Sequence, residues 1–414
     1  MKHTYRYILS ISFLLLIASQ SIQAQVDSTL FKRVRPSVTR DSLLNMDAQY
    51  ERPFLSINKT PVAIGGYVEA NWQNISKEGV SDGHQFQFRR FTLFTSATIS
   101  QRIKFLAELE FEDGTREIAL EFAAVDFEFD PLLNFRGGIV VNPIGAFNQN
   151  HDGPKWEFTD RPIASTEMLP ATWSTAGFGL YGKKNLQDWT LGYEAYLTSG
   201  FDRLIIENDQ GRTSLPASKE NPDRFEINES GAIFTTGKLA IKNHKIGELG
   251  ISHMGGVYNK HFEEGEHVDI KRRVDAFALD FNTEIPHWGT QLITEAAWVR
   301  VDVPKTYSQQ FGTKQFGGFV DIVQPIVKGR ILGWDDATLN LALRSEFVDW
   351  NKDTFKETSE SIGDELWSFM PAISFRPAPQ TVLRFNYRFQ KERDLFRNPA
   401  ERTDGFSFGI SSYF

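Results

Sequence analysis

The stretch GFSFGISSYF, residues 405–414, decides the fold. Its alternate positions, up to the last aromatic, are Phe406, Phe408, Ile410, Ser412 and Phe414. Successive side chains of a strand point to opposite faces, so these five residues share one face. An apolar face that ends on Phe is typical of the closing strand of a bacterial outer-membrane barrel. The stretch therefore predicts an all-β protein, a transmembrane antiparallel β-barrel.

The same period of two recurs from residue 61 onward. It is seen in residues 62–72, 103–111, 339–347 and 383–389. In the last of these, the apolar positions Leu383, Phe385, Tyr387 and Phe389 alternate with Arg384, Asn386 and Arg388. One face of each strand is expected to meet lipid, and the other a wet interior.

Short and long links alternate between these stretches. The short links are predicted at residues 100–102, 130–132, 184–187, 243–245, 286–289, 329–336 and 377–380. The other links are predicted at residues 73–84, 112–116, 143–175, 201–230, 259–271, 302–314, 350–362 and 391–403. Outer-membrane barrels join their strands by short periplasmic turns and longer external loops. The pattern predicts about 16 strands, enough to leave an aqueous channel.

The amino end is typical of an exported protein. Lys2 and Arg6 flank a short apolar core, residues 8–17, and small residues precede Ala24, so residues 1–24 are predicted to be a signal peptide. Residues 25–60 are polar and lack a period of two, and we interpret them as a periplasmic segment before the barrel domain, residues 61–414. The chain has no cysteine, and after the signal no apolar stretch has the ~20 residues of a membrane helix.

Composition agrees with this interpretation. The 35 Phe, 9 Trp and 11 Tyr would supply aromatic girdles at the two membrane interfaces. Removing residues 1–24 takes away two basic residues and no acid, which changes the net charge from −8 to −10. Such a charge disfavours nucleic acid as a partner.

Four segments carry a resemblance to a known family. They are FQFRRFTLF (86–94), FRGGIVVNPIGAFNQNHDGPKWEFTDRP (135–162), STAGFGLYG (174–182) and LRSEFVDWN (343–351). In order and spacing the chain resembles the phosphate-selective porin O and P family. The resemblance implies a homotrimer of 16-stranded barrels in the bacterial outer membrane, embedded in its lipid, with the third external loop folded inward to narrow the pore. Here that loop would be residues 143–175. The implied function is passive diffusion of small charged solutes, with phosphate and other anions as candidates.

Basic residues are candidates for the pore lining and its constriction. Those expected at the lumen are Arg136, Lys155, Arg161, Arg344, Arg384 and Arg388, with Arg300 and Arg376 on further strand faces. The same faces carry the carboxylates Glu69, Glu108, Glu110, Asp126, Glu128, Glu194, Glu284 and Glu346. The arginines could pass anions by repeated bidentate contact, or they could pair with these carboxylates to hold the wall. Arg89 and Arg90 are adjacent, and the phase shift around them predicts a β-bulge.

Catalytic, cofactor and metal sites have little support, and we expect no enzyme. His151–Asp152 could be a dyad or a solvated turn. His261 and His267 bracket three glutamates, but no rigid element fixes them. Glu207, Asp209 and Gly211 fall far short of a calcium loop. The alternative function is a barrel whose external loops bind a partner or polysaccharide, with the pore incidental.

Overall fold

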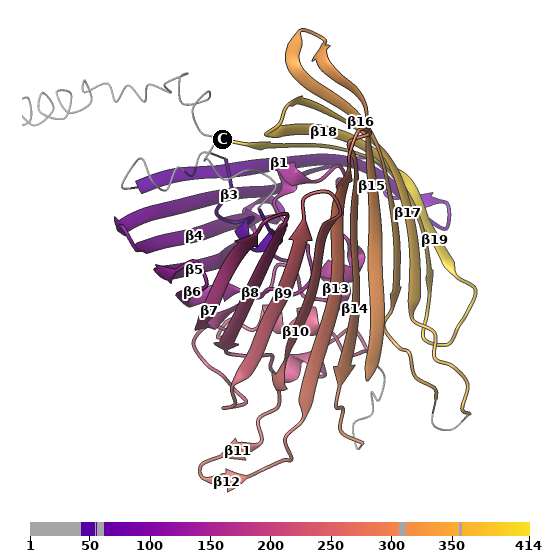
Figure 1. The fold of residues 1–414 in the computed structure, drawn as a ribbon. Helices are drawn as coiled ribbons and strands as arrows, with labels where there is room; N and C mark the ends of the chain where they lie inside the picture. The colour runs from indigo at the N-terminus through magenta and orange to yellow at the C-terminus, as the bar shows by residue number, and fades with distance from the viewer. Residues whose placement is uncertain (1–42, 54, 56–61, 306–311, 356–357) are drawn as a thin grey trace, which may run out of the picture. The chain divides into compact units, whose positions relative to one another are not determined.

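The computed structural model describes residues 43–53, 55, 62–305, 312–355 and 358–414, which belong to one compact unit, Arg40–Phe414 (Figure 1). The predicted signal peptide and most of the predicted periplasmic segment lie outside the described residues. In the described part of the chain, no helix combines the length and apolarity needed to cross a membrane.

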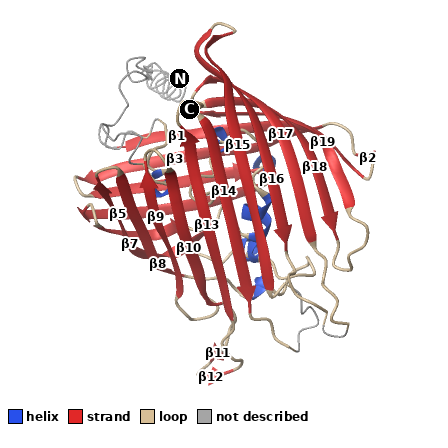
Figure 2. Cartoon of the chain, turned by 45° about the vertical axis from the view of Figure 1, so that its right-hand side comes forward, coloured by secondary structure: helices blue, strands red, loops and turns tan. Residues whose placement is uncertain are grey.

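Sixteen antiparallel strands close into a barrel, as predicted (Figures 1 and 2). The first eight are β1 (Val62–Lys77), β3 (Gln85–Ser100), β4 (Ile103–Glu112), β5 (Glu117–Asp130), β6 (Leu133–Val141), β7 (Ser174–Leu186), β8 (Trp189–Thr198) and β9 (Phe234–Asn243). The other eight are β10 (Gly247–Val257), β13 (Arg273–Ile285), β14 (Thr290–Val301), β15 (Lys314–Ile331), β16 (Trp334–Asp349), β17 (Glu365–Ala378), β18 (Thr381–Arg393) and β19 (Glu401–Tyr413). Two small hairpin elements, β2 (Val80–Ser81) and the pair β11 (Phe262–Glu263) and β12 (Glu266–His267), lie in the links.

The barrel closes where β19 pairs with β1. Ala70 lies opposite Ile410 and Trp72 opposite Phe408. Beyond the last strand residue, Gly66 and Phe414 exchange two backbone hydrogen bonds of 3.1 and 3.0 Å. A Cβ at Gly66 would lie 2.0 Å from the carbonyl oxygen of Thr92, so only glycine fits where the three strands meet. The closing function predicted for residues 405–414 is confirmed.

The two faces of the wall follow the predicted alternation. On β18, Phe385 is 43% exposed to the outside, whereas Arg384 is 1% exposed and points inward. The bulge is also confirmed, because the β1–β3 register passes from Glu69–Arg90 to Ala70–Phe88 and leaves Arg89 as the extra residue. The expectation for Arg300 is wrong. Its neighbours Val299 and Val301 are buried, so Arg300 faces outward.

The predicted alternation of short and long links is confirmed, with tighter turns than expected. Between β15 and β16 only residues 332–333 remain, because both strands continue through the predicted 329–336 link. Among the described residues, three of the five exposed tryptophans, Trp189, Trp288 and Trp334, lie at this short-turn end, and the other two, Trp298 and Trp367, lie toward the long-link end of β14 and β17. Exposed tryptophans near the two ends of the strands are typical of aromatic girdles.

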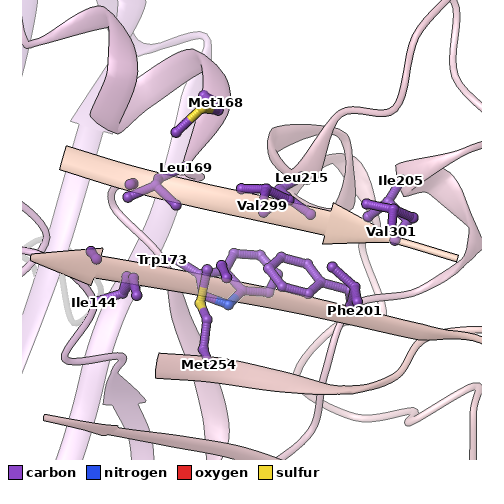
Figure 3. Packing of buried hydrophobic residues seen from close by; sticks show 14 of the residues in the cluster. Ile144, Met168, Leu169, Trp173, Phe201, Ile205, Leu215, Met254, Val299 and Val301 are labelled. Carbon is purple, nitrogen blue, oxygen red and sulfur yellow. The ribbon is translucent and has the colours of Figure 1, made fainter. Parts of the chain in front are cut away.

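An apolar cluster fills the barrel toward its long-link end (Figure 3). It joins side chains from the links 142–173 and 199–233 to inward-facing alanines and valines of β13 and β14. Trp173 and Phe201, one from each link, stack with ring centroids 4.8 Å apart. Burying each large side chain contributes roughly 1.5–3 kcal/mol, so both links are held firmly in place.

Candidate functional site: a constricted lumen

The third long link, residues 142–173, lies inside the barrel. It leaves β6, carries the short helices η4 (Gly153–Lys155) and η5 (Ala164–Met168), and returns to β7. Its atoms bond to inward-facing residues of β1, β8, β9, β10 and β14 and of β16 to β19. In Figure 2, helical turns are visible behind the strands, within the barrel. We call residues 142–173 the inner loop.

Glu295 of β14 holds the beginning of the inner loop. Its carboxylate accepts hydrogen bonds from the backbone N–H groups of Ala146 (2.7 Å) and Phe147 (3.1 Å) and from the Ser165 hydroxyl (2.8 Å). Gly145 adopts φ +65°, and a Cβ there would lie 2.3 Å from a Glu295 oxygen. The glycine therefore permits both the turn and the close approach to the wall.

Two of the predicted pore arginines hold the far side of the inner loop. Arg384 donates to the carbonyl oxygens of Gly153 and Trp156, at 3.1 Å each, and pairs with Glu69 at 2.7 Å. Arg344 donates to the carbonyl oxygen of Asp160 at 2.7 Å. The remaining nitrogens of Arg344 bind Asp321 of β15 in a bidentate pair. Both guanidinium groups are buried, and their hydrogen bonds and ion pairs join the loop to the wall.

Asp160 at the tip of the inner loop collects a second group of cations. Arg388 of β18 pairs with it at 2.6 Å and Arg89 of β3 at 3.1 Å. Burial alone would raise the pKa of Asp160, but the ion pairs with Arg388 and Arg89 lower it to about 2. The Arg388 and Arg89 side chains remain 22% and 24% exposed, so this cluster is in contact with water in the lumen.

The other three predicted residues are also paired. Arg136 binds Asp126 at 2.8 Å, on the neighbouring strand. Lys155 of the inner loop lies 3.4 Å from Asp152. Arg161 lies 3.7 Å from Glu112 and 3.8 Å from Glu110 of β4. Each of the six basic side chains thus has a carboxylate oxygen within 4 Å. These carboxylates belong to the strands of the wall or to the inner loop.

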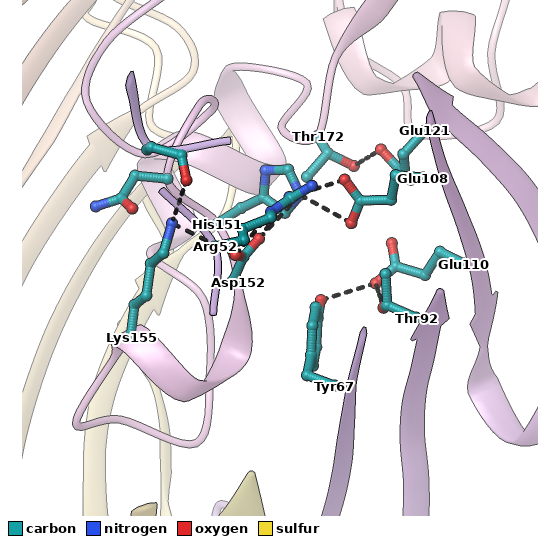
Figure 4. A network of polar contacts seen from close by, with 12 residues as sticks. Arg52, Tyr67, Thr92, Glu108, Glu110, Glu121, His151, Asp152, Lys155 and Thr172 are labelled. Carbon is teal, nitrogen blue, oxygen red and sulfur yellow. Dashed lines mark hydrogen bonds and ion pairs between the residues drawn. The ribbon is translucent and has the colours of Figure 1, made fainter. Parts of the chain in front are cut away.

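Residues 43–53 and 55 also enter the barrel, which the sequence did not reveal. Arg52 is fully buried and bridges Glu108 of β4 (2.8 Å) and Asp152 of the inner loop (2.7 Å), as Figure 4 shows. Tyr50 bonds to Asp126 and accepts a hydrogen bond from Arg136 at 2.6 Å. The segment is polar and aperiodic, so no sequence pattern marked it as an occupant of the lumen.

Glu108, His151 and Asp152 are one group of possible metal ligands among the described residues, with ligand atoms within 4.8 Å of one another. The Arg52 guanidinium bridges both carboxylates and supplies the positive charge there. Burial would raise the pKa of Asp152, but Arg52 and Lys155 hold it well below its usual range. The arrangement is that of an ion-pair network. The His151 ring nitrogen Nδ1 lies 2.8 Å from the carbonyl oxygen of Asn148, in a tight loop turn.

A cavity of about 690 Å³ opens at the short-turn end. Residues 43–51 and the inner loop form one side, and β9, β10, β13 and β14 form the other. Its charged lining is Asp47, Glu51, Lys155, Lys242, His244, Glu248 and Glu284. The cavity can hold hydrated small ions or a small polar solute, and its lining is polar and of mixed charge.

No family model matches the chain. A protein of Aquifex aeolicus with no characterised function is 24% identical over 367 residues, which cover 82% of this chain and 79% of that protein. Among solved structures, the chain is similar to an anion-selective porin from Comamonas acidovorans (12% identity, 85% of this chain and 99% of that chain, TM-score 0.52). Pseudomonas putida OprB gives 10% identity over 85% of this chain and 93% of that chain, with TM-score 0.52. Outer-membrane OmpT of Vibrio cholerae gives 8% identity, 86% and 99% coverage, and TM-score 0.52. At these identities the likeness is one of fold, and the chain has the 16-stranded antiparallel barrel of these outer-membrane proteins.

Proposed function

We propose that this protein is a non-enzymatic channel of the bacterial outer membrane for passive diffusion of small charged solutes. The observation that supports this proposal most strongly is a closed 16-stranded barrel whose outward face is apolar and whose inward face carries charged side chains. A barrel of this size leaves space for an aqueous path, and here the inner loop narrows it. The exposed tryptophans at the short-turn end support a position in a lipid bilayer. The resemblance to the porin O and P family and the solved porins of like fold suggest a homotrimer.

Anion preference, with phosphate as a candidate solute, is the finer proposal and rests on the resemblance. Each of the six basic candidates already has a carboxylate partner, so a passing anion must compete with those carboxylates. The Asp160 cluster is the place where such competition is easiest, because Arg89 and Arg388 are partly exposed to the lumen. We therefore expect any anion preference to be modest.

Conductance in a planar bilayer tests the proposal. The purified protein is expected to give discrete, voltage-independent steps, and the reversal potential in a salt gradient should show at most a modest preference for the anion. Heat-denatured protein is the control for detergent leaks. Protein that is folded by circular dichroism yet never conducts would refute the channel proposal.

Topology gives an independent test. We expect cysteines at Glu264 and Asp353, both in long links, to react with a membrane-impermeant thiol reagent on intact cells. A cysteine at Asp130, beside the β5–β6 turn, should stay unlabelled until the cells are broken. The chain has no native cysteine, so every signal reports the introduced thiol. Labelling at Asp130 alone would invert the proposed orientation.

One feature favours the alternative in which a loop binds a partner. The β11–β12 hairpin extends beyond the other links in Figure 1. It carries exposed large apolar side chains, Phe262, Val268 and Ile270. Loss of a surface interaction on replacing these three by serine, with unchanged conductance, would support that additional function.

A further inference from the structure

Residues 43–53 and 55 follow the inner wall from β10 round to β3, near the short turns. The segment begins beside β9 and β10, where Lys242 donates to the carbonyl oxygen of Leu43 at 2.6 Å and Glu248 accepts from the Asn45 N–H at 3.0 Å. Lys183 of β7 pairs with Asp47 at 2.7 Å. The segment thus has side-chain anchors on successive strands of one half of the barrel.

The wall contains a place shaped for this segment. Gly192 of β8 faces inward, and a Cβ there would lie 2.4 Å from Leu44 Cδ1 and 2.8 Å from Met46 Sδ. Leu44 is 4% exposed and Leu55 is 6% exposed, so apolar contacts secure both ends of the segment. A glycine under the crossing point and buried leucines at each end indicate a defined position for the segment.

The segment meets the inner loop across the lumen. Arg52 joins wall to loop through Glu108 and Asp152, with its guanidinium 3.9 Å above the ring of Phe94. Lys155 of the inner loop donates to the carbonyl oxygen of Ala48 at 3.2 Å (Figure 4 shows Lys155 and Arg52 in this network). The segment contacts the wall from β3 to β10. The inner loop shares β8 to β10 with it and also reaches β1, β14 and β16 to β19.

We propose that residues 43–53 form a second constriction of the channel, at the short-turn mouth, latched by Arg52 to the wall and the inner loop. This inference rests on the proposed function, since a segment can restrict only a lumen that conducts. Solutes pass the short-turn mouth through the cavity that the segment shares with β9, β10, β13 and β14. The segment therefore sets the size limit at this mouth, together with Asn150 and Lys155 of the inner loop, which line the same cavity.

The test compares three variants with the wild-type protein in planar bilayers. The first variant lacks residues 43–53 in an otherwise full chain and carries Glu108→Gln and Asp152→Asn, because unpaired buried carboxylates would destabilise it. The second keeps the segment and removes the latch with Arg52→Met, Glu108→Gln and Asp152→Asn. Arg330→Ala is the matched control, an exposed arginine in the β15–β16 hairpin at the same mouth. Neutral polymers of graded size, added to one side at a time, measure the limit of each mouth.

We expect the deletion to raise single-channel conductance roughly twofold and to admit larger polymers from the short-turn side, because the water-filled path there becomes wider. The latch variant should show a smaller change in the same direction, and Arg330→Ala none. A conducting wild type with an unchanged size limit in the deletion variant overturns this inference and leaves the channel proposal intact. Silence of the wild type and of both variants overturns both.

A full-length variant guards against misfolding of the deletion. Ala48→Cys places a single thiol in the segment beside the cavity. We expect a bulky thiol reagent added from the short-turn side to reduce its conductance, with Ser81→Cys in the β1–β3 link as the control. Complete labelling at position 48 without any change of conductance would place the segment outside the conducting path.

Discussion

Deleting residues 148–156 is expected to raise single-channel conductance roughly threefold and to leave the barrel assembled, because the inner loop occupies the lumen while every strand pairs with its neighbours without it. These residues include the contacts of Gly153 and Trp156 with Arg384. Their removal frees the middle of the loop from the β18 side of the wall. Conductance in planar bilayers gives the result, and the shift of folded barrel on unheated gels reports assembly.

A second deletion serves as the matched control. Residues 263–266, at the tip of the β11–β12 hairpin, are exposed and belong to a long link. Their loss should leave conductance unchanged. If the assembled inner-loop deletion conducts like the wild type, the inner loop does not form the narrowest part of the path. The constriction would then lie elsewhere, and residues 43–53 would be the next candidate.

The wall of the barrel could be predicted because each strand carries its own pattern. From Leu383 to Phe389, alternate side chains face the outside and the interior of the barrel, and a short turn follows every second stretch of this kind. The same rule failed at Arg300 for a physical reason. Ala297, Val299 and Val301 are apolar but face inward, where they pack against the two links that enter the barrel. An apolar face therefore does not mark lipid wherever a loop fills the lumen.

The contents of the lumen could be predicted only in part. The family resemblance implied that residues 143–175 fold inward, but the partners of these residues are far away in the sequence. Arg384 and Gly153 are 231 residues apart, and no local pattern couples them. Residues 43–53 show the same limitation more strongly, because the burial of Arg52 depends on both Glu108 and Asp152, which are distant in the sequence. Pairing of arginines with carboxylates was one of two interpretations, and deciding between them required the geometry.

Replacing Arg89 and Arg388 by glutamine is expected to shift the reversal potential strongly toward cations. Both arginines pair with Asp160, and both are partly exposed to the lumen. Their removal takes away two positive charges and leaves the Asp160 carboxylate without its closest partners. A charge in a narrow, partly dewatered passage is weakly screened, so the change should be visible at moderate salt.

The decisive control adds Asp160→Asn to the double variant. This third substitution removes the unpaired negative charge, so the reversal potential should return most of the way to the wild-type value.

The pH dependence gives a second criterion. In the wild type the two ion pairs outweigh the effect of burial and hold the pKa of Asp160 at about 2, so the stabilisation by these pairs is present above the ordinary value of 3.8 and is lost as the pH falls through about 2. Without Arg89 and Arg388, burial acts with less opposition and raises the pKa of Asp160. As the pH is lowered, the double variant should therefore lose its cation preference at a higher pH than the pH at which the wild-type protein loses its ion pairs to Asp160. A reversal potential that does not move in the double variant would mean that permeating ions never pass the Asp160 cluster, and the conducting path would then follow the β9 to β14 side of the barrel.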